Sequence, residues 1–224
     1  MSFRVFHLFA CMDKCLFPVT SVILAGGRGI RIGGGKGLQL LHGKPLTSWV
    51  LEAVSRDSAE ILINANDAED EFGIFGCPVL ADQIQGWQGP LAGLHVALLN
   101  AQSDYVMTVP CDTPFLPHDL IARLCDGFNR MDAEAVVVVA GVYRQPTIAL
   151  YRKSVLPKLT AYLESGGRKV NDWLDSLQLC EVVFDNAACF DNINTREDLA
   201  RAAQTPVASG TTVDPERPRK DMEK

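Results

Sequence analysis

Apolar residues follow two alternating patterns along the chain. Short, nearly continuous apolar runs, typical of buried strands, lie at 22–24, 60–64, 79–81, 105–109, 135–140, 146–151 and 181–184. Apolar residues at helical spacing lie between or after these runs, at 46–55, 90–101, 120–128, 156–163, 170–177 and 195–203. Continuous apolar strands are typical of a parallel sheet that helices cover on both faces. The pattern therefore predicts a three-layer α/β fold with a mostly parallel central sheet.

The two ends of the chain differ from this central part. Residues 1–19 carry a short apolar patch that His7 interrupts and that Asp13 and Lys14 follow, which is a poor match to a signal peptide. Residues 204–224 are rich in Pro, Thr and charge and have almost no apolar content. We therefore expect a poorly ordered N-terminal extension at 1–19, one domain at 20–203 and a disordered tail at 204–224. A second start codon at Met12 would remove most of the extension.

The first apolar run ends at Gly26 and Gly27, and the stretch that continues to Gly37 is rich in glycine and basic residues. It holds seven Gly, two Arg and one Lys, among them Arg31 and Lys36. Glycine permits positive φ, and successive free N–H groups with cationic side chains bind an anion. A flexible surface loop is the alternative, but the strand before the stretch favours a phosphate-binding loop. The Walker A motif is absent, because Gly37 follows Lys36.

Polar residues stand directly after the other predicted strands. Asn64, Asp82 and Asp112 each follow an apolar run, and ligands bind α/β sheets at the carboxyl ends of the strands. Asp112 also lies between Pro110 and Pro114, which restrict its backbone. A turn or a cap is the alternative reading of each polar residue. Beside a phosphate-binding loop, however, Asp112 is favoured as a ligand of Mg²⁺.

Composition limits the classes of function. The 224 residues suffice for one sizeable α/β domain, and the net charge of −6 argues against a general nucleic-acid or anionic-membrane surface. No stretch approaches the roughly 20 apolar residues of a membrane span. The seven cysteines are scattered without a CxxC pair, so a disulfide framework or a zinc site is not expected and a cytoplasmic location fits best. No motif of covalent catalysis occurs.

A series of motifs occurs in order along the chain. The series is Leu24-Ala25-Gly26-Gly27 with Arg31, Gly33-Gly34 and Lys36-Gly37, then Gly43-Lys44-Pro45-Leu46, Asn64-Ala65-Asn66, Gly89-Pro90-Leu91-Ala92-Gly93, Pro110-Cys111-Asp112-Thr113-Pro114, Pro146-Thr147-Ile148-Ala149-Leu150 and Asn192-Ile193-Asn194-Thr195. Together these motifs, which span about residues 22–203, closely resemble the molybdenum cofactor guanylyltransferase family. The resemblance implies a Rossmann-like nucleotidyltransferase fold. It also implies transfer of GMP from GTP to the terminal phosphate of molybdopterin, with release of pyrophosphate.

The resemblance further implies roles for individual residues. Lys36 and Arg31 hold the phosphates, and Asp112 binds both the nucleotide and Mg²⁺, so these three are the expected catalytic residues. The residues expected to bind the nucleotide are Leu24, Ala25, Gly26, Gly27, Lys36, Asn64, Asp82 and Asp112. The residues that match the region of the pterin substrate are Arg168, Lys169, Asn192 and Asn194. Transient contacts with other cofactor-synthesis proteins and with apo-molybdoenzymes are also implied.

One departure from the family pattern lies in the loop. Family members usually have an extra residue, often with Asp directly before the loop lysine, whereas here Gly35 precedes Lys36 and the loop is one residue shorter. Two alternative functions remain open. One is a related cytidylyl or sugar-1-phosphate nucleotidyltransferase, and the other is a non-catalytic protein that carries a nucleotide or the cofactor.

Overall fold

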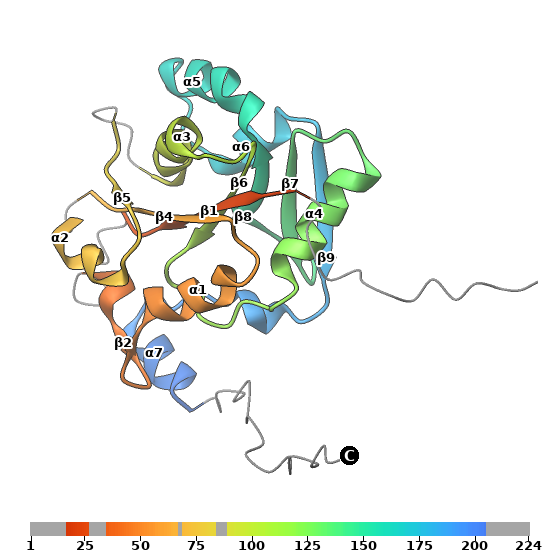
Figure 1. The fold of residues 1–224 in the computed structure, drawn as a ribbon. Coiled ribbons are helices and arrows are strands. Elements are labelled where there is room, and N and C mark those ends of the chain that lie inside the picture. Colours follow the sequence, from red (N-terminus) through yellow and green to blue (C-terminus); the bar gives the residue numbers. More distant parts are fainter. Residues whose placement is uncertain (1–16, 27–34, 67–68, 84–88, 205–224) are drawn as a thin grey trace, which may run out of the picture.

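The computed structural model describes residues 17–26, 35–66, 69–83 and 89–204, and within them a seven-stranded sheet forms the middle layer (Figure 1). The strands are β1 (Val19–Leu24), β4 (Glu60–Asn64), β5 (Val79–Leu80), β6 (Tyr105–Pro110), β7 (Ala135–Ala140), β8 (Tyr143–Arg152) and β9 (Leu179–Phe184). They lie in the order β5-β4-β1-β6-β8-β7-β9. A separate two-stranded ribbon consists of β2 (Leu40–Leu41) and β3 (Lys44–Pro45).

The sheet is mostly parallel, as the apolar runs predict. β1 pairs in parallel with β4 and with β6, and the pairs β4–β5 and β7–β9 are also parallel. Only β8 is antiparallel to its described neighbours, β6 and β7. It begins three residues before the predicted strand at 146–151, because Gly141 adopts a φ of 61° and allows the chain to turn back directly after β7.

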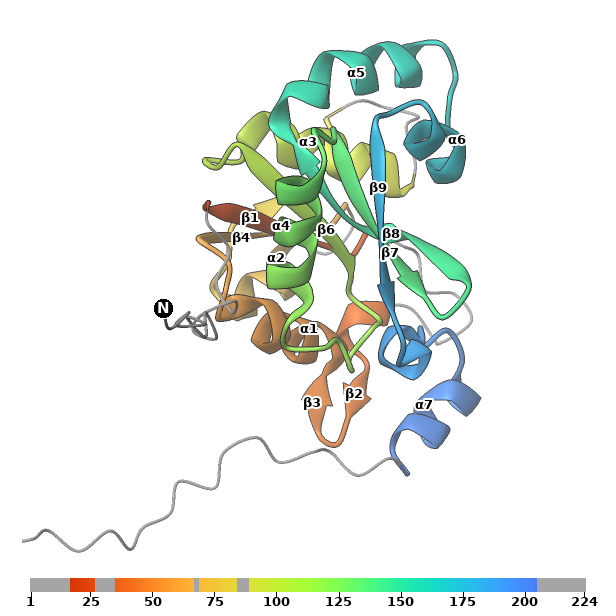
Figure 2. The same cartoon turned by 90° about the vertical axis from the view of Figure 1, so that its right-hand side faces the viewer.

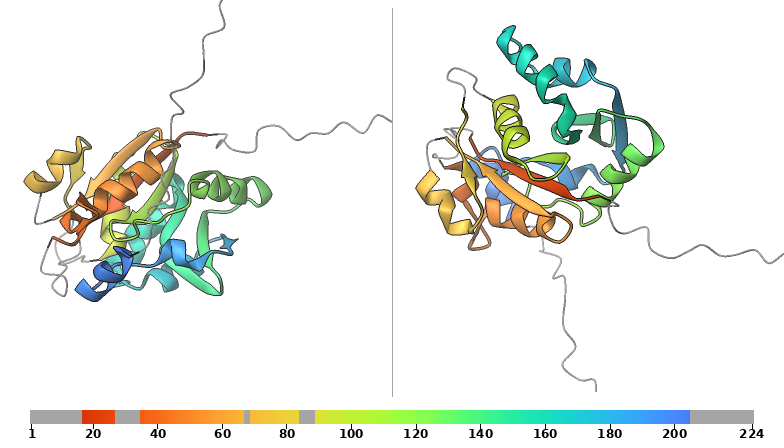
Figure 3. Two further views of the ribbon diagram at one scale, coloured as in Figure 1. Left: turned by 90° about the horizontal axis from the view of Figure 1, so that it is seen from below. Right: turned by 45° about the horizontal axis from the view of Figure 1, so that its top comes forward.

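Helices cover both faces of the sheet. They are α1 (Leu46–Ser55), α2 (Glu69–Phe72), α3 (Pro90–Asn100), α4 (Leu120–Arg130), α5 (Leu156–Glu164), α6 (Val170–Asp175) and α7 (Arg196–Ala202), with short 3₁₀ segments at η2 (Lys36–Leu38), η3 (Gly73–Phe75), η4 (Lys153–Val155) and η5 (Ala187–Phe190). α3, α5 and α6 pack on one face and α1 and α4 on the other (Figures 1 and 3). In the described part of the chain, no helix has the length and apolar character that crossing a membrane requires.

Each face of the sheet has its own buried apolar cluster. Val50 of α1 and Leu124 of α4 belong to one cluster, and Leu94 of α3 and Leu159 of α5 belong to the other. The strands supply side chains to both clusters, because successive residues of a strand point to opposite faces. Two covered faces explain why the central strands β6 and β7 are apolar at almost every position rather than at every second one.

A third, smaller cluster joins α7 to the β2–β3 ribbon, on the side of the molecule seen in Figure 2. It contains Leu41, Leu46, Ile193 and Ala202. The ribbon turns through His42 and Gly43, which both have positive φ, as two-residue hairpin turns of type I′ require. The apolar pattern of the sequence predicts no strand at these positions. The packing of α7 on the ribbon brings the segment before α7 back beside the residues that follow β1.

We expect Gly127→Ala to destabilise the protein although alanine favours helices. A Cβ atom at Gly127 in α4 would lie 2.6 Å from Val136 Cγ1 and 3.2 Å from Val182 Cγ2, so the helix could not stay as close to the sheet. Overpacking of this kind lowers the free energy of unfolding by about 1–3 kcal/mol. Chemical denaturation measures the change. Gly73→Ala, whose Cβ would meet nothing within 4 Å, is the control, and equal stability of the two variants would contradict the prediction.

Candidate functional site

A cavity of about 600 Å³ opens at the C-terminal ends of β1, β4 and β6. Its wall includes the last residue of each of these strands, namely Leu24, Asn64 and Pro110. β1 pairs with β4 on one side and with β6 on the other, so the chain runs to opposite sides of β1. In open α/β sheets such a point leaves a crevice in which ligands bind. The volume is that of a small-molecule site.

An ion pair between Lys36 and Asp112 occupies part of the cavity wall. Lys36 Nζ also donates a hydrogen bond of 2.6 Å to Asn194 Oδ1. The side chains of Lys36 and Asp112 are only 18% and 5% exposed, so their attraction is screened less than that of a surface pair. The three residues come from the stretch after β1, from the end of β6 and from the segment before α7. We call them the charged end of the cavity.

Close packing against α1 fixes the backbone beside Lys36. Gly35 has a φ of 50° at the start of η2, which suits glycine. Gly37 lies so close to Thr47 Oγ1 that a Cβ atom would collide with it, and the Thr47 hydroxyl donates a bond of 2.9 Å to the Gly37 carbonyl. The glycines on both sides of Lys36 therefore have a structural role in placing it.

Backbone hydrogen bonds hold Asp112 at the sheet edge. The amide of Cys111 donates to the Leu24 carbonyl at 3.1 Å, and the amide of Ile193 donates to the Asp112 carbonyl at 2.9 Å. Asp112 Oδ2 pairs with Lys36, whereas Asp112 Oδ1 is buried and has no hydrogen-bond partner among the described residues. A buried carboxylate oxygen without a partner costs free energy. It is therefore ready to accept a ligand that carries positive charge or a hydrogen-bond donor.

The charged end fits a divalent cation that arrives with a nucleotide. Mg²⁺ binds one or two protein carboxylates and completes its coordination with water and substrate phosphates. Asp112 offers such a carboxylate. Within the described ranges, no group of three or more His, Cys, Asp or Glu side chains could hold a metal by itself. The chemistry of the donor set thus suits a cation shared with phosphates and not one enclosed by protein ligands.

A capping box at the start of α7 orients Asn194. The Thr195 side chain accepts a bond from the Asp198 amide at 3.1 Å, and Asp198 Oδ2 accepts bonds from the amides of Thr195 and Asn194 at 3.0 and 3.1 Å. The hydrogen bonds from Thr195 and from the Asn194 backbone lower the pKa of Asp198. The helix cap therefore holds the backbone of Asn194, and the contact with Lys36 holds its side chain.

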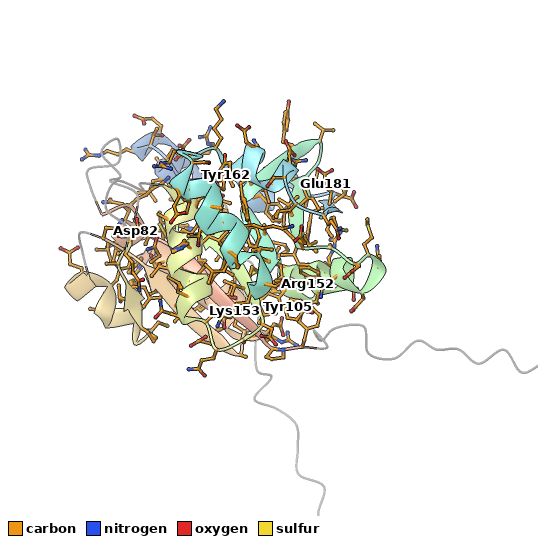
Figure 4. All side chains as sticks on the ribbon, turned by 90° about the horizontal axis from the view of Figure 1, so that it is seen from above. Asp82, Tyr105, Arg152, Lys153, Tyr162 and Glu181 are labelled. Carbon is orange, nitrogen blue, oxygen red and sulfur yellow. The ribbon has the colours of Figure 1, made fainter. Side chains whose placement is uncertain are left out.

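At the ends of β4 and β5 the wall consists of the Asn64 and Asn66 side-chain amides around the Asp82 carboxylate. We call these three residues the amide end of the cavity. Asn64, which is 4% exposed, donates through Nδ2 to the Leu80 carbonyl at 3.1 Å and to Asp82 Oδ1 at 2.9 Å. Asn66 Nδ2 donates to Asp82 Oδ2 at 2.9 Å, and the Asp82 amide donates to Asn66 Oδ1 at 2.8 Å. Figure 4 shows Asp82 on the opposite side of the molecule from Glu181, which lies on the other edge strand.

Two further parts of the wall come from α3 and β8. Gly89 and Pro90 line the cavity, so the N-terminal end of α3, which carries a partial positive charge, faces the site. Gly93 must be glycine, because a Cβ there would lie 2.7 Å from Leu24 Cδ2. The register of β7 and β8 shifts between Val137 and Val138, and this irregularity of β8 includes Thr147, which lines the cavity.

Cys111 lies beside Asp112 but is not suited to be a nucleophile. Burial first, and then the charge of Asp112, raise the pKa of the Cys111 thiol to about 12. The thiol therefore stays protonated at neutral pH, and the thiolate is the reactive form. Cys111 is a small buried residue of the core.

The structure brings most of the predicted site residues together. Those that line the cavity are Leu24, Gly26, Lys36, Asn64, Asp82, Asp112, Asn192 and Asn194. Ala25 instead packs in the buried cluster, and its amide donates to the Asn64 carbonyl at 2.8 Å. Gly27 and Arg31 lie outside the described residues. Arg168 and Lys169 lie between α5 and α6 and do not line this cavity, so their assignment to the pterin substrate stays a prediction.

Six further residues line the cavity although the sequence predicts no ligand contact for them: Asn66, Gly89, Pro90, Pro110, Cys111 and Thr147. Asn66 could have been found, because alternate residues of an extended chain share a side and Asn66 comes two residues after Asn64. Thr147 gives no comparable signal, since the irregular pairing of β8 is a property of the assembled sheet.

Comparisons with known proteins agree with this geometry. A family model described as a MobA-like NTP transferase domain matches residues 21–180. The molybdenum cofactor guanylyltransferase of Cupriavidus metallidurans is 43% identical over 187 residues, which cover 81% of this chain and 92% of the relative. The enzyme of the same name from Vibrio parahaemolyticus is 43% identical over 82% of this chain and 94% of the relative.

Among solved structures, molybdopterin-guanine dinucleotide biosynthesis protein A from Archaeoglobus fulgidus is similar in fold. It superposes with a TM-score of 0.70 at 26% identity, over 82% of this chain and 96% of that protein. By its sequence relatives and by its family model, the chain belongs to the molybdenum cofactor guanylyltransferase family, within the MobA-like NTP transferases.

Proposed function

We propose that this protein transfers GMP from GTP to the terminal phosphate of molybdopterin, releases pyrophosphate and forms the guanine dinucleotide cofactor. The observation that carries the proposal is the charged end of the cavity, where Lys36 and Asp112 meet at the carboxyl ends of β1 and β6. At this edge of the sheet, the lysine can bind the phosphates of a triphosphate and the carboxylate can bind its cation. The names of the relatives favour GTP over CTP and molybdopterin over a sugar phosphate.

Binding of GTP changes the partners of Lys36 and Asp112. In the structure the two side chains neutralise each other. When it is bound, a divalent cation, which we take to be Mg²⁺, neutralises the charge that builds on the phosphates. Asp112 would hold that cation with Oδ2 and with Oδ1, the oxygen that lacks a partner. Lys36 is then free to donate to phosphate oxygens while Asn194 keeps its ammonium group at the cavity wall.

The reaction needs little proton transfer from the protein. A phosphate oxygen of molybdopterin attacks the α-phosphorus of GTP, the bond between the α-phosphorus and the bridging oxygen breaks, and pyrophosphate leaves. A phosphate monoester is largely ionised near neutral pH, so no strong general base is required. Catalysis then consists of positioning and of stabilising negative charge on the leaving group. Lys36 supplies this stabilisation, and Arg31 of the same loop is proposed to assist it.

The second substrate is proposed to approach from the side of Asn192 and Asn194, which line the cavity beside Asp112. Arg168 and Lys169 are candidates for more distant contacts with the pterin. We also propose that the protein acts in the cytoplasm and makes transient contacts with other cofactor-synthesis proteins and with the apo-molybdoenzymes that receive the product.

The first test is pyrophosphate release from purified protein supplied with GTP, Mg²⁺ and molybdopterin. We expect release that depends on both substrates, at a rate at least about tenfold higher with GTP than with CTP or UTP. Comparable release with CTP would indicate a cytidylyltransferase. Tight binding of GTP without any release would indicate a nucleotide carrier, and either result would contradict the proposal.

We expect Asp112→Asn and Asp112→Ala to lower the rate of guanylyl transfer at least about 100-fold, because the cation loses its protein carboxylate. Asp112→Asn keeps the size of the side chain, so thermal unfolding should show a folded protein. Asp119→Asn, at an exposed carboxylate that pairs with Arg123, is the control and should keep full activity. A near-normal rate of transfer by Asp112→Asn would show that Asp112 does not hold the cation.

Lys36→Ala should raise the dissociation constant of GTP about tenfold or more, since a hydrogen bond to a charged group contributes about 1.5–3 kcal/mol. Isothermal titration calorimetry measures the change. Lys158→Ala, which removes a surface partner of Glu134, is the matched control. An unchanged constant for Lys36→Ala, in protein that melts at the wild-type temperature, would show that Lys36 does not hold the phosphates.

A further inference from the structure

Among the described residues, Asp82 makes its hydrogen bonds to amide groups. Asn64 donates to one oxygen of its carboxylate and Asn66 to the other, each at 2.9 Å. The contact with Asn66 is reciprocal, because the Asp82 backbone amide donates to Asn66 Oδ1 at 2.8 Å. Both polar atoms of the Asn66 side chain are therefore used on Asp82. This pairing fixes the rotation of the carboxylate as well as its position.

Asn66 is the less constrained of the two amides by its surroundings. Asn64 is buried, also donates to the Leu80 carbonyl at 3.1 Å and packs against Gly93, so its place is set by the sheet and by α3. Asn66 is exposed and stands two residues beyond β4. Its hydrogen bonds to Asp82 serve no buried group of the core. They are most simply explained by a requirement for the orientation of the carboxylate in the cavity wall.

The amide end lies at a suitable separation from the charged end. Asp82 follows β5 and Asp112 follows β6, and β4 and β1 lie between these strands. Three strand spacings of about 4.8 Å each give roughly 14 Å. A nucleoside triphosphate can span this separation, with its phosphates at Lys36 and its base near Asp82.

The chemistry of the carboxylate then selects the base. Each oxygen of Asp82 accepts one bond from an asparagine and keeps a second lone pair. Two adjacent donors in one plane match two carboxylate oxygens. Guanine offers N1–H and the 2-amino group side by side, whereas adenine, cytosine and uracil lack two adjacent donors on that edge.

Resting on the proposed function, we propose that Asn66 is a positioning residue for base selectivity: it holds the Asp82 carboxylate in the plane that accepts both donors of guanine. The inference concerns how the nucleotide is chosen and not how the phosphoryl group is transferred. It predicts that loss of Asn66 affects the recognition of the 2-amino group more than the binding of the nucleotide in general.

The test compares the dissociation constants of GTP and of inosine triphosphate, which is GTP without the 2-amino group. Both are measured by calorimetry with Mg²⁺ and without molybdopterin, for the wild type, Asn66→Ala and Asn66→Asp. Asn66→Asp keeps an acceptor for the Asp82 amide, but it replaces the donor to the Asp82 carboxylate by a second negative charge, so it turns this contact from attraction into repulsion. Asn66→Ala removes the contact without adding charge. Asn100→Ala, at an exposed asparagine that donates to the Val96 carbonyl in α3, is the control.

We expect the wild type and the control to bind GTP at least about tenfold more tightly than inosine triphosphate. Both Asn66 variants should reduce this ratio to below about threefold, chiefly through weaker binding of GTP. A wild-type ratio near one, or a wild-type ratio kept in both variants, would overturn the inference. No transfer takes place in this experiment, so its result does not depend on whether the protein transfers GMP to molybdopterin. In the same way, an unchanged ratio of dissociation constants would contradict the role of Asn66 and would not contradict the transfer reaction.

Discussion

The ion pair between Lys36 and Asp112 connects three parts of the chain that share no local structure. Removing two charges from water costs several kcal/mol for each ion, and attraction compensates for this only when the geometry is good and hydrogen bonds complete it. Here Asn194, 158 residues away from Lys36, accepts a hydrogen bond from the Lys36 ammonium group, and the Ile193 amide donates one to the Asp112 carbonyl. One oxygen of Asp112 remains without a partner in the described structure. The arrangement holds its residues in place and still leaves capacity for a ligand.

The sheet separates two kinds of chemistry along one cavity. At the end of β6 the wall is charged and suits phosphates, whereas at the ends of β4 and β5 it consists of amides around one carboxylate. Because each end belongs to different strands, we expect substitutions at the charged end to affect the phosphates and substitutions at the amide end to affect the choice of base. The proposed reaction thus uses the spacing of parallel strands to hold a nucleotide by its two ends.

The layered fold and much of the site are predictable from the sequence for definite reasons. β6 and β7 are apolar at nearly every position, and the polar residues inside β1, Thr20 and Ser21, are buried, as in a sheet covered on both faces. Asn64, Asp82 and Asp112 could be identified because they follow strands, and parallel strands end at one edge. These three residues do line the cavity.

Other features depend on contacts that no local pattern encodes. The β2–β3 ribbon has only two residues in each strand, which is too short for an alternation of apolar and polar residues to be visible. β8 is antiparallel and irregular at Thr147, and both properties arise from its pairing with β7. The bond between Lys36 and Asn194 joins residues at opposite ends of the domain. A resemblance to a family can associate such residues with a substrate, but only the folded chain shows that they touch each other.

The capping box of α7 has a consequence for the order of the C-terminal part of the domain. The Asp198 side chain accepts a hydrogen bond from the Asn194 amide, and the Asn194 side chain accepts one from Lys36. Asn194 therefore connects the first turn of α7 to Lys36. Seven residues form too short a helix to be stable alone. Any ligand that favours the observed place of Lys36 therefore also favours the folded state of α7, and fraying of α7 weakens the hold on that lysine. We therefore expect occupancy of the proposed nucleotide site and local unfolding of α7 to be thermodynamically linked.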